Sequence, residues 1–131
     1  MSKIKGIHHV ALKVSTVKFD EVMKFYTEIL DLTVVRTWNE GKAAMVSTGD
    51  NSVLEIMASE DWPLDCAEGP FAHVALETDA VDELTEKIRA AGYQITVEPT
   101  DVTIPSEEPY PIRISFCIGA GNEIVEFFHV K

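Results

Sequence analysis

Hydrophobic and polar residues alternate along the first half of the chain in four short runs, and a helical repeat separates the first two runs. A period of two is typical of β-strands, and a period near 3.6 is typical of an amphipathic helix. The predicted strands are 4–14, 32–38, 42–48 and 52–58. Ser15 or Thr16 is expected to cap a helix that continues to about Asp31. Both faces of the first strand carry apolar residues, so we expect both faces to be covered.

The second half of the chain repeats this order of one strand, one helix and three strands. The predicted strands are 71–77, 93–100, 112–118 and 123–130. The predicted helix follows Thr78 and Asp79 and ends at Gly92. Its buried stripe is expected at Val81, Leu84, Ile88 and Ala91. The prolines between residues 99 and 111 predict an irregular loop, and the glycine pair in 119–122 predicts a turn between strands rather than a nucleotide-binding loop.

One four-residue phrase occurs twice, as His9-Val10-Ala11-Leu12 and as His73-Val74-Ala75-Leu76. Near the end of each half, a short apolar strand carries a single acid in its middle, Glu55 in the first half and Glu126 in the second. Self-similarity of this kind indicates a duplicated structural module. The pattern therefore predicts an α+β fold made of two βαβββ modules.

The modules are expected at residues 4–58 and 70–131, joined by an acid-rich linker at 59–69. At 131 residues the chain is long enough to bury a core without disulfides or structural metals, so we expect one domain over 1–131.

Composition excludes several classes of partner. The formal net charge of −11 opposes binding to phosphate backbones, so we expect no nucleic-acid partner. No apolar run approaches the length of a membrane span, and the first residues lack the apolar core of a signal peptide. Cys66 and Cys117 have no metal-finger spacing, which favours reduced thiols. These features predict a cytoplasmic protein without a membrane partner.

Four polar residues interrupt apolar strand faces: His9, Glu55, His73 and Glu126. Buried carboxylates need compensation, which a divalent cation supplies. Imidazole and carboxylate together suit Zn, Ni, Co, Fe or Mn rather than Ca or Mg. A single strand histidine is usually a hydrogen-bonded core residue and a single strand glutamate is usually solvated. The occurrence of both at matching strands of the two halves favours a metal site, whereas His129 is expected on the opposite face.

These features resemble the vicinal oxygen chelate superfamily, which includes glyoxalase I and the bleomycin-resistance proteins. The resemblance covers nearly the whole chain. It implies that each module curls into a half-barrel and that two half-barrels enclose a metal ion, as in the homodimer of glyoxalase I. The ligand order His9, Glu55, His73, Glu126 is most similar to that of bacterial glyoxalase I, of the type that often prefers nickel or cobalt.

The resemblance implies a lyase or isomerase that acts on the hemithioacetal of an α-ketoaldehyde and a thiol. In that family the metal binds two adjacent substrate oxygens and acts as a Lewis acid on the enediolate that forms. Glu126 is then the expected base that moves a proton between neighbouring carbons, and Glu55 is the second candidate. A surrounding apolar cavity is expected from Ile7, Val53, Met57, Phe71 and Phe128.

Three further positions bear on the substrate. Lys13 stands where glyoxalase I carries an arginine four residues after the first ligand, and Ser59 stands where it carries an asparagine four residues after the first glutamate. Lysine cannot make the forked contact of arginine, so this departure weighs against recognition of glutathione. Arg113 is either a second contact for an anion or a surface residue.

Other functions on the same scaffold remain open. An epimerase of acyl thioesters uses the same enolate chemistry but usually has glutamine where Glu55 stands. Thiol transferases that open fosfomycin, and extradiol dioxygenases, use two histidines and one glutamate, which would leave Glu55 spare. Bleomycin-sequestering relatives lack the ligands altogether and bind drug in a groove between subunits.

Overall fold

The computed structural model of the protein describes residues 3, 9–61, 73–105 and 109–131. The chain forms two compact units, Met1–Leu64 and Asp65–Lys131. Among the described residues, no helix has both the length and the hydrophobicity needed to cross a lipid bilayer.

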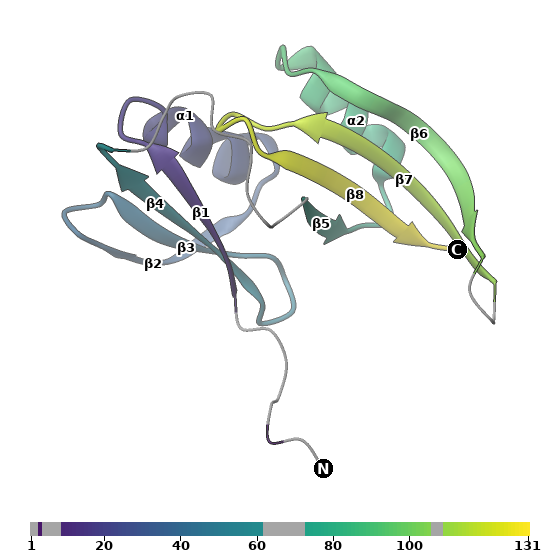
Figure 1. Cartoon of the computed structure of the whole chain (residues 1–131), viewed down its shortest axis with the longest axis horizontal. Coiled ribbons are helices and arrows are strands. Elements are labelled where there is room, and N and C mark those ends of the chain that lie inside the picture. Colours follow the sequence, from purple (N-terminus) through teal and green to yellow (C-terminus); the bar gives the residue numbers. More distant parts are fainter. Residues whose placement is uncertain (1–2, 4–8, 62–72, 106–108) are drawn as a thin grey trace. The chain divides into compact units, whose positions relative to one another are not determined.

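The first unit contains one four-stranded sheet and one short helical segment (Figure 1). Its elements are β1 (His9–Ser15), α1 (Phe19–Lys24), the π-helical turn η1 (Phe25–Ile29), β2 (Thr33–Trp38), β3 (Ala43–Ser47) and β4 (Val53–Ser59). The strand order is β1-β4-β3-β2, with β1 parallel to β4 and the other pairs antiparallel. A helical crossover is what allows the first and last strands to run parallel.

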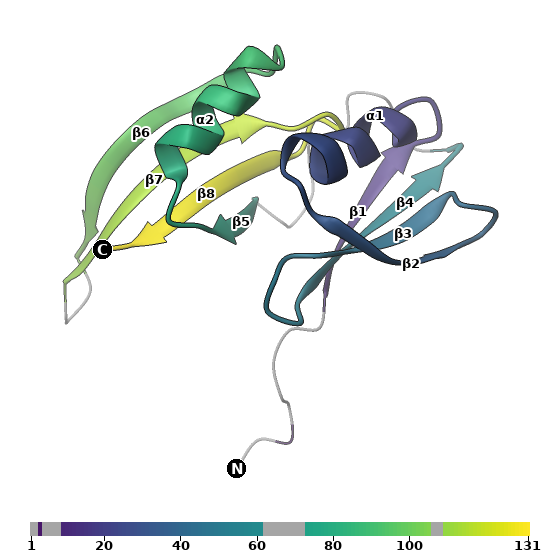
Figure 2. The same ribbon diagram turned by 180° about the vertical axis from the view of Figure 1, so that it is seen from behind.

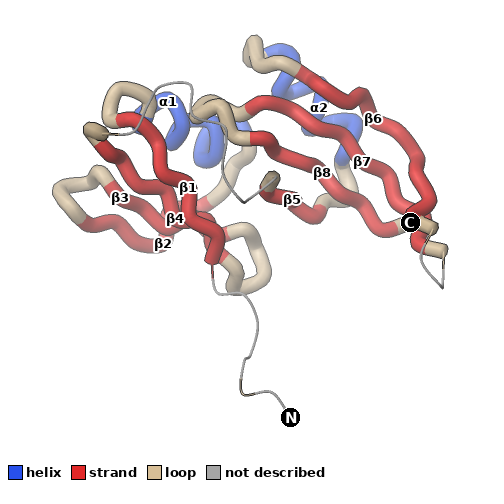
Figure 3. The backbone as a smooth tube through the Cα atoms, in the orientation of Figure 1, coloured by secondary structure: helices blue, strands red, loops and turns tan. Residues whose placement is uncertain are grey.

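The second unit has the same order and the same pairing, as the strands in red show in Figure 3. Its elements are β5 (Val74–Glu77), α2 (Val81–Ala90), β6 (Ile95–Ile104), β7 (Tyr110–Ile118) and β8 (Ile124–Val130). The strand order is β5-β8-β7-β6, with β5 parallel to β8. Each unit is therefore a βαβββ module, and the predicted fold class is confirmed.

Each helix packs against one face of the sheet of its own unit, and this contact makes the core (Figure 2). In the first unit the fully buried side chains include Val22, Phe25, Tyr26, Val46, Leu54 and Ile56. In the second unit they include Val81, Ile88, Cys117, Val125 and Phe127. The opposite face of each sheet carries no helix of its own unit among the described residues.

The first helix differs from the prediction at both ends. Strand β1 continues through Ser15, whose carbonyl accepts a hydrogen bond from the Lys18 amide, and the helix begins only at Phe19, so neither Ser15 nor Thr16 is the cap. After Lys24 the backbone widens into a π-turn. The wider turn lets the adjacent Phe25 and Tyr26 both reach the core, where each is 0% exposed.

The prediction that both faces of the first strand are covered is wrong. Val14 is buried, but His9, Ala11 and Lys13 are exposed. These three residues lie on one face by the two-residue period of the strand. The face of β1 opposite to the helix is therefore open in the first unit.

The second unit departs from the predicted loop before its last strands. Strand β6 continues through Pro99 to Ile104, and β7 already begins at Tyr110 and includes Pro111. Strand β6 is the edge of its sheet, and its register shifts between Val97 and Thr100, next to the proline. An edge strand tolerates proline because the missing amide is not needed for pairing on the outer side.

The second helix begins at Val81, later than Thr78 and Asp79, and the predicted stripe is partly wrong. Val81 and Ile88 are buried, but Ala91 is exposed and Leu84 is only half-buried. Thr85 takes the central buried position because its hydroxyl bonds to the backbone one turn earlier and to Ser115 of β7. The predicted end of the helix at Gly92 is confirmed, since this glycine adopts a positive φ of 93°.

Candidate metal centre

The first candidate pair joins the two parallel strands of the first unit. His9 is the first residue of β1, and Glu55 lies in the middle of β4. The register pairs His9 with Val53 and Ala11 with Glu55, so the histidine and the glutamate share the open face of the sheet. Their Nε2 and Oε2 atoms are 3.1 Å apart, with the glutamate side chain 14% exposed and the histidine 38% exposed.

The second unit builds the same pair from corresponding elements. His73 directly precedes β5, and Glu126 lies in β8 beside Ala75. The Nε2 atom of His73 is 3.0 Å from Oε2 of Glu126. Phe116 of β7 pairs with Glu126 and packs the edge of its ring against the His73 imidazole, with centroids 5.3 Å apart. This aromatic contact fixes the orientation of the histidine ring.

The neighbours of both glutamates along their strands point to the helix side, as the two-residue period of a strand requires. Leu54 and Ile56 flank Glu55 and are buried, and Val125 and Phe127 flank Glu126 and are also buried. The buried neighbours hold each strand rigidly, so each carboxylate projects from the opposite face.

Burial raises the pKa of the Glu126 carboxyl. The residue is 8% exposed, and the loss of solvent raises the pKa of its carboxyl above the ordinary value, although the charge and hydrogen bond of His73 act in the opposite direction. A carboxylate with a raised pKa holds a proton more readily. It is therefore suited to accept a proton from a weak carbon acid and to return it.

The geometry of each pair fits two adjacent ligands of one ion. Two donors that each lie about 2.1 Å from an ion, at right angles to each other, are about 3.0 Å apart. The His9–Glu55 and His73–Glu126 separations of 3.1 and 3.0 Å match this spacing, and the donor set is the one that Zn, Ni, Co, Fe and Mn prefer. Within the described part of the chain, no three His, Cys, Asp or Glu side chains form a single group. Each unit thus brings two potential donor atoms together.

Lys13 and Ser59 lie on the same sheet face as the first pair. Lys13 is paired with Met57, next to Glu55, and is exposed. Ser59 ends β4 and is paired with Ser15, which ends β1. Ser15 is 6% exposed, and its hydroxyl oxygen has no hydrogen-bond partner among the described residues. The C-terminal ends of β1 and β4 therefore carry one cation, Lys13, and two hydroxyl groups, those of Ser15 and Ser59.

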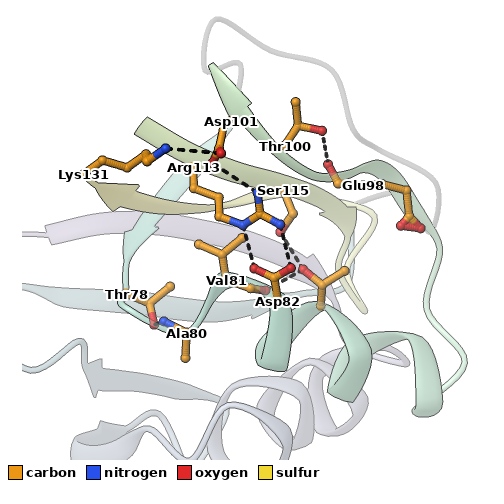
Figure 4. Close-up of polar contacts among 11 residues, drawn as sticks. Thr78, Ala80, Val81, Asp82, Glu98, Thr100, Asp101, Arg113, Ser115 and Lys131 are labelled. Atoms are coloured by element: carbon orange, nitrogen blue, oxygen red, sulfur yellow. Dashed lines mark hydrogen bonds and ion pairs between the residues drawn. The ribbon is translucent and has the colours of Figure 1, made fainter. Parts of the chain in front are cut away.

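Arg113 lies on the other face of its sheet, away from Glu126. Arg113 is paired with His129, three positions along the ladder from the pair of Phe116 and Glu126. An odd number of positions along a strand places a side chain on the opposite face. The Nε and Nη2 atoms of Arg113 each lie 2.7 Å from one carboxylate oxygen of Asp82, at the start of α2. Figure 4 shows this forked contact and the further ion pair with Asp101.

Lys131 adds a second cation to Asp101, with its Nζ atom 3.2 Å from the carboxylate (Figure 4). The hydrogen bonds of Arg113 lower the pKa of both Asp82 and Asp101 and raise the pKa of Arg113 itself. The guanidinium therefore links α2 to β6, and we do not include Arg113 in the proposed substrate site. His129 is on the helix face, as expected, 3.2 Å from Asp79.

The sequence did not identify Phe116 as a residue that contacts the second His–Glu pair. The register of the β7–β8 hairpin places it beside Glu126, and that register follows from the turn at 119–122. Counting outward from this turn would have placed Phe116 opposite Glu126. Of the residues predicted to form the cavity, Ile7 and Phe71 lie outside the described residues, and Val53 and Met57 lie on the face of Glu55.

The fold and the paired donors define a protein class: paired βαβββ modules with a histidine and a glutamate on the open face of each sheet. A sequence model of the Glyoxalase/Bleomycin resistance protein/Dioxygenase superfamily matches residues 6–107, and the chain belongs to this superfamily. The resemblance drawn from the repeated phrase is thereby confirmed.

Individual relatives agree with this assignment. The chain is 33% identical over 103 residues to a Vibrio parahaemolyticus protein named "Probable lactoylglutathione lyase", and the match covers 70% of each protein. A glyoxalase/dioxygenase structure from Nostoc punctiforme has a TM-score of 0.77 at 18% identity, covering 98% of this chain and 93% of its own. A lactoylglutathione lyase structure from Agrobacterium tumefaciens has a TM-score of 0.68 at 14% identity, covering 98% and 96%. At these identities the two structures show a shared fold.

Proposed function

We propose that the protein is a metal-dependent lyase or isomerase of the glyoxalase I type. Its substrate is then the hemithioacetal that an α-ketoaldehyde forms with a thiol. The observation that carries this proposal is the repeated His–Glu pair, with separations of 3.1 and 3.0 Å at corresponding places in the two units. The name of the Vibrio parahaemolyticus relative supports the same reaction class.

We propose that His9, Glu55, His73 and Glu126 together hold one divalent ion, with Ni, Co or Zn as the first candidates and Mn or Fe as alternatives. When bound, such an ion supplies Lewis acidity that stabilises negative charge on the oxygens of the substrate. The two imidazoles contribute neutral donors, and the two carboxylates offset the charge of the ion. A carboxylate that dissociated from the ion would be able to exchange a proton with the substrate.

Glu126 acts as the base in this proposal. Its carboxylate removes the proton from the carbon that carries the hydroxyl and the sulfur, and the electron pair of that C–H bond becomes part of an enediolate. The same carboxyl then returns the proton to the neighbouring carbon, which gives the thioester of a 2-hydroxy acid without any change in composition. Burial of Glu126 and its raised pKa support this role. Glu55 is the alternative base.

Lys13 and Ser59 are the proposed substrate contacts of the first unit. Lys13 is on β1, paired with Met57, and Ser59 is the last residue of β4. Both lie on the sheet face that carries Glu55, where they can bind polar groups of the thiol. A lysine binds an anion as a point charge, so this end of the site is less selective for a planar carboxylate than an arginine would be.

A homodimer is the proposed assembly. Five large apolar residues on the Glu126 face of β6, β7 and β8 are 38–40% exposed: Val97, Val102, Ile104, Tyr110 and Val130. Exposed apolar residues gathered on one sheet face mark an interaction surface. A small-molecule substrate and a cytoplasmic location complete the proposal, since reduced thiols suit that compartment.

The experiment that tests the function combines metal analysis with turnover. Protein purified without chelators is expected to carry about one divalent ion per chain and to convert a mixture of an α-ketoaldehyde and a thiol into a thioester, followed by absorbance. Several thiols are compared, with and without carboxylates. A metal-loaded protein that converts no such mixture would exclude the lyase. If the protein takes up neither nickel nor zinc, a metal-free binding module is the remaining hypothesis.

A further inference from the structure

A β-bulge in strand β2 determines which side chain faces the first His–Glu pair. Val34 is paired with Val46 of β3, but the next pair joins Arg36 to Met45, so β2 contains one extra residue, Val35. With regular pairing and no bulge, Val35 would pair with Met45 and Arg36 would pair with Ala44, on the face that the helix covers. The bulge instead turns Arg36 to the face of Glu55. Bulges commonly re-aim a side chain beside a functional site.

After the bulge, Arg36 lies in the same cross-strand row as the candidate ligand. Arg36 pairs with Met45, and Met45 pairs with Glu55. Residues that pair across strands point to the same side of the sheet. Two strand spacings of about 4.8 Å separate the Cα atoms of Arg36 and Glu55 by about 10 Å. The guanidinium therefore belongs to the same open face, at the edge opposite to Lys13 of β1.

The electrostatic state of Arg36 differs from that of the other two arginines. Arg89 contacts Glu86 and Glu98, and Arg113 contacts Asp82 and Asp101. Within the described part of the chain, Arg36 has no carboxylate within ion-pair distance, although the whole chain has a net charge of −11. An arginine without an ion-pair partner among the described residues, on the face of a candidate site, is suited to an anionic ligand.

We propose that Arg36 binds a carboxylate of the substrate's thiol portion and so selects acidic thiols. The inference rests on the proposed function, because it assigns a substrate group to the same open face. A planar guanidinium offers two parallel donors to a carboxylate, which lysine cannot do. The bound carboxylate lies toward the β2 edge of the sheet, and the reacting carbons lie near Glu55, about two strand spacings away.

Equilibrium binding of a matched pair of probes tests this assignment. The probes are S-methylglutathione and its dimethyl ester, in which methyl groups replace the charge of the two carboxyl groups, and binding to the full chain is measured by calorimetry. The wild-type protein is expected to bind the acid more tightly than the ester. Arg36→Met is expected to weaken binding of the acid by at least tenfold and to leave binding of the ester within about twofold. Arg36→Lys is expected to recover part of the loss.

Lys42→Met is the matched control, because Lys42 is an exposed cation next to β3 and its replacement changes the net charge by the same amount. It is expected to leave the binding of both probes unchanged. Equal binding of acid and ester by the wild type would overturn the inference, and so would an Arg36→Met protein that still prefers the acid. Circular dichroism establishes that each variant is folded.

The outcomes separate this inference from the proposed function. If the protein turns over hemithioacetals but Arg36→Met keeps the preference for acids, the proposed reaction stands and the proposed role of Arg36 is wrong. If Arg36→Met loses the preference for acids but the wild-type protein converts no hemithioacetal, the anion-binding role of Arg36 stands and the proposed lyase function is wrong.

Discussion

The imidazole of His73 and the carboxylate of Glu126 are in contact, with Nε2 and Oε2 3.0 Å apart, although the two residues belong to opposite ends of their module. Parallel pairing of β5 and β8 brings them together. The first unit reproduces this contact between His9 and Glu55, with the same Val-Ala-Leu sequence after the histidine but with different loops. Because the contact recurs in both copies of the duplicated module, it follows from the strand pairing that the two sheets share and not from the loops of either one.

Replacing Glu126 by glutamine should lower turnover and metal binding together, because Glu126 is both the proposed base and one of the four proposed ligands. The change removes the proton acceptor, and loss of a general base costs roughly 10²–10⁴-fold in turnover. Because burial raises the pKa of Glu126, its ionised form disfavours the folded state at neutral pH, and stability falls as the pH rises through that pKa. Glutamine cannot ionise, so the melting temperature of the metal-free protein should stay constant or rise. Turnover and thermal unfolding measure the two effects.

Glu83→Gln is the control for this substitution. Glu83 is exposed on α2, so its replacement removes the same charge away from the open face and should leave turnover unchanged. Full activity in Glu126→Gln would transfer the role of base to Glu55. Retained metal and activity in Glu55→Ala would favour the scaffold's two-histidine, one-glutamate enzymes over the glyoxalase type.

The sequence was sufficient to predict the module order and the face that carries each glutamate. These features follow from a two-residue period and from an internal repeat, which are properties of side chains in a row. The helix-side positions of Leu54, Ile56, Val125 and Phe127 followed from the same period. The contact between each histidine and its glutamate was not predicted within a single module, since it depends on the parallel pairing of β1 with β4 and of β5 with β8.

The features that the sequence did not predict depend on tertiary contacts. Pro99 reads as a loop residue, but it is tolerated because β6 has a free outer edge. The extra residue Val35 cannot be recognised in a run of β-branched residues, so the orientation of Arg36 emerged only from the register of β2 and β3. The π-turn depends on the packing of Phe25 and Tyr26.

The hydroxyl pair between α2 and β7 should contribute measurably to stability. Thr85 Oγ1 bonds to the Val81 carbonyl and to Ser115 Oγ, each at 2.7 Å, and both side chains are 1% exposed. Thr85→Val would leave the Ser115 hydroxyl buried without its partner, at a cost of about 1–3 kcal/mol in the free energy of unfolding. The double variant with Ser115→Ala should lose less than the sum of the single losses. Urea unfolding of all four proteins measures this coupling, and strict additivity would contradict it.

Stability should depend on the ionisation of Asp82 at acid pH. The hydrogen bonds from Arg113 hold the pKa of this carboxyl below its ordinary value of about 3.9. A group with a lowered folded-state pKa stabilises the protein above its unfolded-state pKa and loses that effect as the pH falls through the folded-state pKa. Asp82→Asn should therefore lower the urea midpoint at pH 7, and the difference from the wild type should shrink below about pH 4.

Glu83→Gln, at the next position along α2, is the control for the acid series. It should not reproduce the change in midpoint between neutral and acid pH. A difference between Asp82→Asn and the wild type that stays constant from pH 7 to pH 3 would show that Arg113 does not depend on the ionised carboxylate of Asp82.

Metal stoichiometry should distinguish one shared ion from two separate ones. If the two pairs hold a single ion, titration with zinc or nickel gives one ion per chain, and His9→Ala lowers the affinity of that ion because one of its four ligands is lost. If each pair bound its own ion through only two donors, the chain would take up two ions weakly, and His9→Ala would remove one of them while His73 and Glu126 kept the other. Calorimetric titration of the wild type, His9→Ala and His73→Ala reads both the number of ions and their affinity. Equal weakening in the two histidine variants, at unchanged stoichiometry, is the result that a shared centre requires, since each histidine then supplies one ligand to the same ion.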